Sequence, residues 1–292
     1  MPADWLRSLI LLAMLSVSGA MECPLLAQSL EDALEDLESS WLTRAEREAG
    51  SDDEEIETDR DSFTFATTTV GAGRVMVESA YSFIDNRDVP DSHIYPELIT
   101  RIGLTKRLEL RLGWNYEAGG GGDVSSADAG GDLEEPGVNE EAQLLYGFKY
   151  ALTEQADWLP ASALVLQGTT PTAGPENVSR FLLGYVFGWT IFDDWKLDSS
   201  LRYGTAVEEA DHFNQWAPSI VLKVPVTKRV NVHGEYFGIF TDGRENNTNS
   251  QYFSPGVHYL LTPNCEIGVR VGWGLNHDAA ESFSNVGCGL VF

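Results

Sequence analysis

The stretch LELRLGWNYE, residues 108–117, decides the fold class of this 292-residue chain. Every second residue from Leu108 onward is large and apolar, and the residues between them are charged, polar or glycine. A period of two is the period of a β-strand, because successive side chains of a strand point to opposite faces. The stretch therefore predicts a strand with one apolar face and one polar face.

The same alternation recurs along most of the chain after residue 63, most clearly at 195–203, 230–240 and 266–275. Strands of about ten residues are long for a soluble sheet but suit a tilted strand that crosses a membrane. We predict twelve strands, an even number as bacterial membrane barrels require. The predicted spans are 74–84, 94–104, 108–117, 140–151, 161–169, 180–192, 195–206, 214–226, 230–240, 251–262, 265–275 and 283–292.

Short and long connections alternate between these strands. The short ones fall at 105–107, 193–194, 227–229 and 262–264, and one of medium length runs from 153 to 160. The longer ones are predicted at 85–93, 118–139, 170–179, 207–213, 241–250 and 276–282. Short periplasmic turns and long outer loops are typical of outer-membrane barrels. The pattern predicts an all-β, closed antiparallel up-and-down barrel whose first strand starts, and whose last strand ends, on the periplasmic side.

The polar face is predicted to line the lumen, and the apolar face to meet lipid. A ring of about twelve strands encloses more space than one layer of side chains fills, and closing the ring pairs every strand edge. Aromatic residues near both strand ends predict two interfacial girdles, the alternative being the core of a soluble β-sandwich. The predicted lumen-lining residues are Glu97, Arg101, Glu109, Arg111, Lys196, Asp198, Arg202, His233, Glu235, His258, Glu266 and Arg270.

The N-terminal part is predicted to be exported and to precede the barrel. Residues 1–27 have the pattern of a signal peptide: Arg7, an apolar run at 9–17, and small residues before a cleavage site. Residues 28–62 are predicted to be an acidic helical or disordered periplasmic segment, with an interaction helix or a barrel plug as the less favoured alternatives. The barrel is predicted over 63–292. No later segment has about 18 uncharged apolar residues, so no membrane-spanning helix is expected.

Charge and cysteine content restrict the function. A formal net charge of -26 argues against nucleic acid as a partner, because phosphates require basic residues. After the signal peptide only Cys265 and Cys288 remain, too few for a disulfide scaffold. They are predicted to lie on adjacent strands but out of register, so we expect no disulfide between them.

The sequence contains one set of residues that could serve catalysis. There is no phosphate-binding glycine loop, His-Glu-x-x-His or Cys-x-x-Cys motif. His233, His258 and Ser254 could serve an outer-membrane hydrolase, but lumen lining is the favoured interpretation. The acidic residues at 123–135 could hold calcium, although their spacing favours a flexible loop. We expect no catalytic residue, no cofactor and no metal.

Three segments resemble one known family: ELITRIGLTKRLELRLGWNYE (97–117), LLYGFKYALTEQADWLPASALVLQGTTPTAG (144–174) and YFSPGVHYLLTPNCEIGVRVGWGLNHDAAESFSNVGCGLVF (252–292). The chain is similar over roughly residues 90–292 to the MetA-pathway-of-phenol-degradation family of outer-membrane β-barrel transporters. The resemblance implies a barrel in the bacterial outer membrane that admits small solutes, hydrophobic and aromatic compounds among them, by passive or facilitated diffusion. It supplies no catalytic residues.

The expected partners are outer-membrane lipid, a small-molecule solute, and the barrel-assembly machinery, which would recognise the C-terminal strand ending at Phe292. Three other functions remain open from the sequence alone. They are a non-conducting structural or adhesive barrel, an outer-membrane hydrolase, and a soluble secreted β-sandwich that acts as a binding module.

Overall fold

The computed structural model describes residues 56–60, 62–121, 139–175, 178–192, 194–208, 211–244 and 246–292. The predicted signal peptide, the helical pattern at 30–48, the acidic block at 51–55 and the acidic loop at 123–135 lie outside the described residues.

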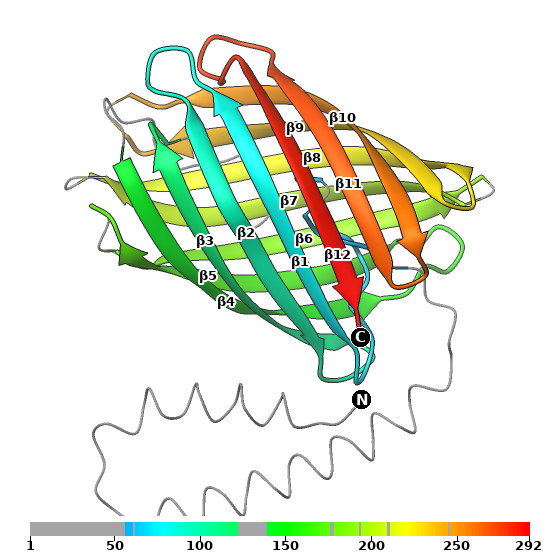
Figure 1. The fold of residues 1–292 in the computed structure, drawn as a ribbon. Helices are drawn as coiled ribbons and strands as arrows, with labels where there is room; N and C mark the ends of the chain where they lie inside the picture. Colours follow the sequence, from blue (N-terminus) through cyan, green and yellow to red (C-terminus); the bar gives the residue numbers. More distant parts are fainter. Residues whose placement is uncertain are drawn as a thin grey trace, which may run out of the picture. The chain divides into compact units, whose positions relative to one another are not determined.

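Twelve antiparallel strands form one closed barrel, in which each strand pairs with its neighbours in sequence and β1 pairs with β12 (Figure 1). This confirms the predicted architecture, and the β-sandwich alternative is wrong because the ring of strands has no open edge. The strands are β1 Val75–Asp85, β2 Ser92–Gly103, β3 Leu108–Gly119, β4 Asn139–Thr153, β5 Ala161–Ala173, β6 Arg180–Ile191, β7 Trp195–Glu208, β8 Asp211–Thr227, β9 Val230–Asp242, β10 Asn249–Thr262, β11 Cys265–Gly274 and β12 Ser282–Val291.

The seam between the first and last strands is regular. It pairs Met76 with Val291 at one end and Asp85 with Ser282 at the other, without a register shift between them. The predicted strand boundaries fall within four residues of those of the structure, and the largest difference is in β5, which ends at Ala173 and not at residue 169. A second difference lies at the connection between β7 and β8. The predicted long connection at 207–213 is wrong, because the ladder continues to the pair Glu208–Asp211. Acidic residues have low strand propensity, so the end of this hairpin has the composition of a loop.

The two faces of the barrel have the predicted polarity. On β3 the side chains of Leu112 and Trp114 are exposed on the outer face, whereas Glu109 and Arg111 are buried inside. The exposed outer face carries large apolar residues on nearly every strand, for example Leu166, Phe181 and Val269. A closed ring with this outer face satisfies its backbone hydrogen bonds internally and needs no second sheet, as a bilayer requires.

Residues 56–60 and 62–70, here called the plug, lie inside the ring of strands (blue in Figure 1). They contain no helix or strand, and most of their side chains are buried. The plug is joined to β1 by a turn in which Gly71 and Gly73 adopt φ values of 80° and 74°. The predicted boundary at residue 62 falls within the plug, so the described residues of the predicted segment 28–62 are in the lumen.

Cys265 and Cys288 are free cysteines on adjacent strands. Cys265 pairs in register with Leu290, and Cys288 pairs with Ile267. This two-residue offset agrees with the expectation from the sequence that the two cysteines are out of register and form no disulfide.

Candidate functional site: a lumen filled by the N-terminal plug

Asp59 of the plug lies in a cluster of three cations from adjacent strands. Its carboxylate is 2.5 Å from Arg111 Nη1, 3.4 Å from Lys149 Nζ and 3.7 Å from Arg101 Nε. The alternation of β2, β3 and β4 points these three side chains into the lumen at neighbouring positions. Burial alone would raise the pKa of the Asp59 carboxyl, but Arg101, Lys149 and Arg111 outweigh it and hold the pKa well below its usual range. The plug is therefore anchored by an ionised carboxylate.

Two carboxylates of the wall complete this cluster. Glu109 Oε1 lies 2.9 Å from Arg101 Nε and 2.9 Å from Arg111 Nη1. Glu78 lies 3.1 Å from Arg101 Nη1, and its Oε2 accepts the backbone N–H groups of Asp59 at 2.8 Å and Arg60 at 2.9 Å. The plug is thus bonded to β1 through its backbone and to β2–β4 through a side chain.

Arg60 of the plug forms an ion pair with a carboxylate on the same part of the wall. Its Nη1 lies 3.0 Å from Glu97 Oε2, and its Nη2 donates to Asn115 Oδ1 at 3.1 Å. Glu97 also accepts hydrogen bonds from Ser82 and Asn285, so one carboxylate connects the plug to β1, β2 and β12.

Glu57 forms a second anionic anchor, with lysines of β7 and β8. It lies 3.5 Å from Lys196 Nζ and 3.4 Å from Lys223 Nζ, and it accepts a hydrogen bond from the Thr68 hydroxyl. Burial acts to raise its pKa, but Lys196 and Lys223 together lower the pKa to about 2. Glu57 is therefore charged across the physiological pH range.

Glu235 on β9 holds the middle of the plug. Its carboxylate accepts the backbone N–H groups of Phe63 at 2.8 Å and Thr64 at 2.7 Å, and the Thr64 hydroxyl at 2.7 Å. Arg270 Nη1 lies 3.6 Å from the same carboxylate. On β11, Glu266 accepts the Thr58 hydroxyl at 2.9 Å. Contacts from β1 round to β11 therefore surround the plug.

The two phenylalanines of the plug enclose a guanidinium group of the wall. The Arg202 Cζ lies 3.9 Å from the ring centroid of Phe63 and 4.1 Å from that of Phe65. Phe63 also stacks on Phe237 of β9 with a centroid distance of 4.2 Å, and Phe65 packs among Val165 and Leu182. Cation–π contacts of this kind strengthen when water is excluded.

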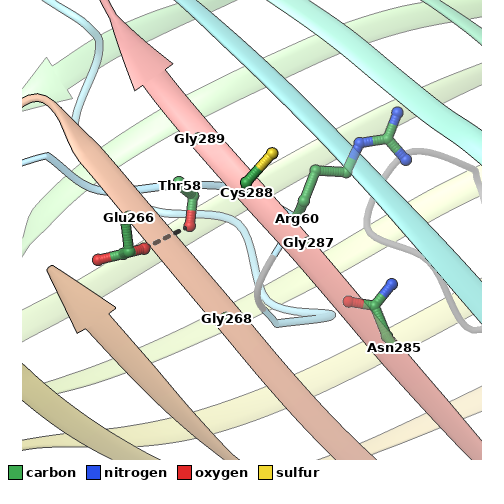
Figure 2. A pocket seen from close by; sticks show the side chains of 8 residues that line it. All are labelled: Thr58, Arg60, Glu266, Gly268, Asn285, Gly287, Cys288 and Gly289. Carbon is green, nitrogen blue, oxygen red and sulfur yellow. Dashed lines mark hydrogen bonds between the residues drawn. The ribbon is translucent and has the colours of Figure 1, made fainter. Parts of the chain in front are cut away.

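A small cavity remains between the plug and the wall formed by β11 and β12, and Figure 2 shows it with the Thr58–Glu266 hydrogen bond. The glycines of this wall allow the plug to approach closely, since a Cβ on Gly289 would lie 2.4 Å from Thr58 Cγ2. The plug therefore leaves little free space on this side. The cavity is lined by Thr58, Arg60, Glu266, Gly268, Asn285, Gly287, Cys288 and Gly289.

The predicted site residues occupy the inner face of the barrel, and all but one are buried. The exception is Lys196, whose side chain is 34% exposed. Those that contact the plug include Glu97, Arg101, Glu109, Arg111, Lys196, Arg202, Glu235 and Glu266. Asp198, His233, His258 and Arg270 are also buried in the wall.

Sequence reasoning missed the plug acids and two wall residues, Glu78 and Lys223. Glu78 alternates with Met76 and Ala80 on a face of mixed polarity, and Lys223 lies in an apolar run, so neither strand shows a clean polar face. The inward direction of each follows only from the register with its neighbours, Ile99 and Lys196.

The hydrolase alternative finds little support in the geometry. His233 Nδ1 and His258 Nε2 are 2.6 Å apart, so the two histidines contact each other. The Ser254 hydroxyl donates to the Val271 carbonyl at 2.9 Å, which directs its proton to the backbone. Among the described residues, no group of three or more metal-ligating side chains is found.

The closed antiparallel barrel, its apolar outer face and its charged interior define a bacterial outer-membrane β-barrel, here with the lumen occupied by a segment of the same chain. The chain belongs to the family described as "Putative MetA-pathway of phenol degradation", whose model matches residues 58–292. The match begins in the plug, earlier than the resemblance noted in the sequence. No curated protein matches the chain. No helix in the described part of the chain is long and apolar enough to cross a membrane.

Solved structures with the same fold include an outer-membrane channel from Pseudomonas putida F1, at 14% identity and a TM-score of 0.53. That similarity covers 81% of this chain and 100% of the other. The translocator domain of the autotransporter NalP from Neisseria meningitidis is 9% identical with a TM-score of 0.47, over 90% of this chain and 97% of the other. The KdgM porin is 12% identical with a TM-score of 0.44, over 74% and 99%.

Proposed function

We propose that this protein is an outer-membrane channel for small solutes, which cross by passive or facilitated diffusion once the plug leaves the lumen. The observation that carries the proposal is the attachment of the plug, which is held without a covalent bond by ion pairs, hydrogen bonds and two buried aromatic rings. The plug therefore acts as a gate.

The chemistry of the plug suits a segment with two positions. Glu57, Asp59, Arg60 and the plug threonines are all well hydrated in water, and the wall groups that bind them become hydrated in an open lumen. Buried ion pairs contribute little net stability compared with their separated, hydrated partners. The contribution of these ion pairs to the free-energy difference between the closed and open states is therefore modest, as a gate requires.

Family membership and fold are consistent with this function. The Pseudomonas putida neighbour is described as an outer-membrane channel, and at 14% identity the likeness to it concerns the fold. We extend the channel function to this chain because its inner wall carries buried charged residues on most of its strands.

The second part of the proposal concerns assembly. β12 ends the barrel, and Phe292 follows it with an exposed aromatic ring. We infer that the barrel-assembly machinery recognises this strand, and that outer-membrane lipid covers the apolar face. Phe292→Ala should then lower recovery of the protein in the outer membrane, without changing the mobility shift on heating of the protein that is recovered.

The gate is tested with a reversible disulfide. The Thr64 and Ser219 hydroxyls lie 2.8 Å apart, which places residue 64 of the plug within disulfide reach of β8. A full-length variant with Thr64→Cys, Ser219→Cys and Asp59→Asn is compared with Thr64→Cys plus Asp59→Asn in a planar bilayer. We expect the double-cysteine variant to conduct when reduced and to be silent when oxidised, whereas the control conducts in both conditions.

Equal currents from the oxidised and reduced double-cysteine variant would contradict gating by the plug. Silence of all variants under all conditions would favour the non-conducting structural barrel. A mobility shift on heating, measured for each variant on a detergent gel, shows that the barrel has closed.

A further inference from the structure

Arg111 contacts two chemically different groups of the plug. Its Nη1 lies 2.5 Å from an Asp59 carboxylate oxygen, and its Cζ lies 5.4 Å from the ring centroid of Phe65. The Nε and Nη2 atoms of this fully buried guanidinium have no hydrogen-bond partner within the described chain. A carboxylate and an aromatic ring thus meet at one guanidinium, which keeps two further donors available.

Other wall residues lie beside each of these two contacts. On the carboxylate side are Lys149 and Arg101, which also face Asp59. On the ring side is Arg202, 4.1 Å from the Phe65 centroid, together with Val165 and Leu182. These residues belong to the wall, so they remain in place when the plug leaves.

The cations of this part of the wall outnumber its carboxylates. Six cations face three carboxylates there, and the plug places two negative charges among them through Asp59 and Glu57. An emptied wall has a larger excess of positive charge, which attracts an anion in place of the plug. The cations are Arg101, Arg111, Lys149, Lys196, Arg202 and Lys223, and the carboxylates are Glu78, Glu109 and Asp198.

We propose that the wall around Arg111 is a binding site for small aromatic carboxylates, and that Asp59 and Phe65 occupy it in the closed state. The proposal rests on the channel function inferred above and specifies its solute class. One aromatic carboxylate places its anion among Arg101, Arg111 and Lys149 and its ring against Arg202 and the apolar floor. A neutral phenol satisfies only the ring side, and an aliphatic carboxylate only the anionic side.

The test uses the full-length chain with Asp59→Ala and Phe65→Ala, which vacates the site. Binding of benzoate, phenol and acetate is measured by titration calorimetry in detergent, independently of conduction. We expect benzoate to bind at least about tenfold more tightly than either of the other two, a difference of about 1.4 kcal/mol. Benzoate should bind at least about tenfold more weakly to the unsubstituted protein, in which the plug occupies the site.

Adding Arg111→Gln to this variant should lower benzoate affinity about tenfold. Arg107→Gln, which removes an exposed arginine paired with Glu154, is the matched control and should leave affinity unchanged. Where Arg111→Gln prevents barrel closure, Arg111→Lys replaces it. It keeps the charge but not the planar guanidinium, and it should weaken benzoate binding more than acetate binding.

Equal affinity for the three probes, or benzoate affinity indifferent to both Arg111 substitutions, would overturn the proposed site. Conductance of the same variant separates this failure from failure of the channel function. A variant that conducts without preferring benzoate refutes only the site, whereas a silent variant that binds benzoate through Arg111 retains the site and refutes the channel.

Discussion

A single carboxylate, Asp59, connects the plug to three cations of the wall. Removing one partner of a buried ion pair costs about 3–5 kcal/mol, because the other partner loses its compensation. Asp59→Asn should therefore shift the plug out of the lumen and raise the open probability in bilayer recordings at least about tenfold. Asp242→Asn, at an exposed position on β9, provides the control. An unchanged open probability would show that Asp59 does not hold the gate closed.

Close packing against β12 offers a second way to move the plug without changing its charges. A Cβ at residue 289 would lie 2.4 Å from Thr58 Cγ2, whereas a Cβ at Gly234 would meet nothing nearer than a Phe253 ring atom at 4.0 Å. Gly289→Ala should expose the chain near Arg60 to trypsin, and Gly234→Ala should not. Cleavage is followed by mass spectrometry of the folded protein. Equal protection in both variants would mean that the plug tolerates the added methyl group in place.

The sequence predicts which wall residues face inward, but it does not predict what they contact. The inward direction of Arg111 follows from the alternation of β3 alone. Its bond to Asp59 joins residues 52 positions apart, and the Lys149 bond to Asp59 joins residues 90 positions apart. Asp59 lies in a segment without periodicity, so no local pattern indicates that it enters the lumen.

At the scale of elements, strands with clean alternation are predicted well, since a lipid-facing strand needs an apolar residue at every second position. The sequence predicts a hairpin of β7 and β8 that ends too early, because residues beyond the apolar belt no longer need that alternation. It divides the plug between a periplasmic segment and the start of the barrel, because the plug contains neither a helical nor a strand pattern. The side chains that hold the plug come from strands far apart in the sequence, which lie next to one another only in the folded wall.

The outer face of β5 allows a direct test of its contact with lipid. Leu166 is 55% exposed near the middle of this strand, and Trp158 is 91% exposed in the connection that precedes it. Leu166→Arg should destabilise the barrel by about 2–4 kcal/mol in urea unfolding from lipid vesicles, because it places a charge in hydrocarbon. Trp158→Arg, at the edge of the membrane, should cost about 0–1 kcal/mol. Equal costs would place residue 166 outside the hydrocarbon.

For the whole molecule, the gate should respond to acid. The pKa of Glu57 lies at about 2 in the closed state, below its ordinary value of 4.5. Because this pKa is lowered, the ionised Glu57 carboxylate stabilises the closed state fully above about pH 4.5. This stabilisation is lost as the pH falls toward 2 and the carboxylate takes up a proton. We expect low current at neutral pH and rising current between these two values. The Glu57→Gln variant should conduct more at neutral pH, and its current should change less on acidification than that of the unsubstituted protein. If both proteins respond to acid in the same way, groups other than Glu57 cause the response.

The hydrogen bonds of the plug differ greatly in the length of chain that they close. Those from Asp59 and Arg60 to Glu78 span 19 and 18 residues, whereas those to Glu235 and Glu266 span 171 to 208 residues. Short loops cost less entropy to close, so we expect the exported, unfolded chain to fold its leading segment back onto β1 before the later strands pair. The remaining strands would then form around a segment already in place, with the seam between β12 and β1 closing last. Assembly in this order requires no threading of a finished ring.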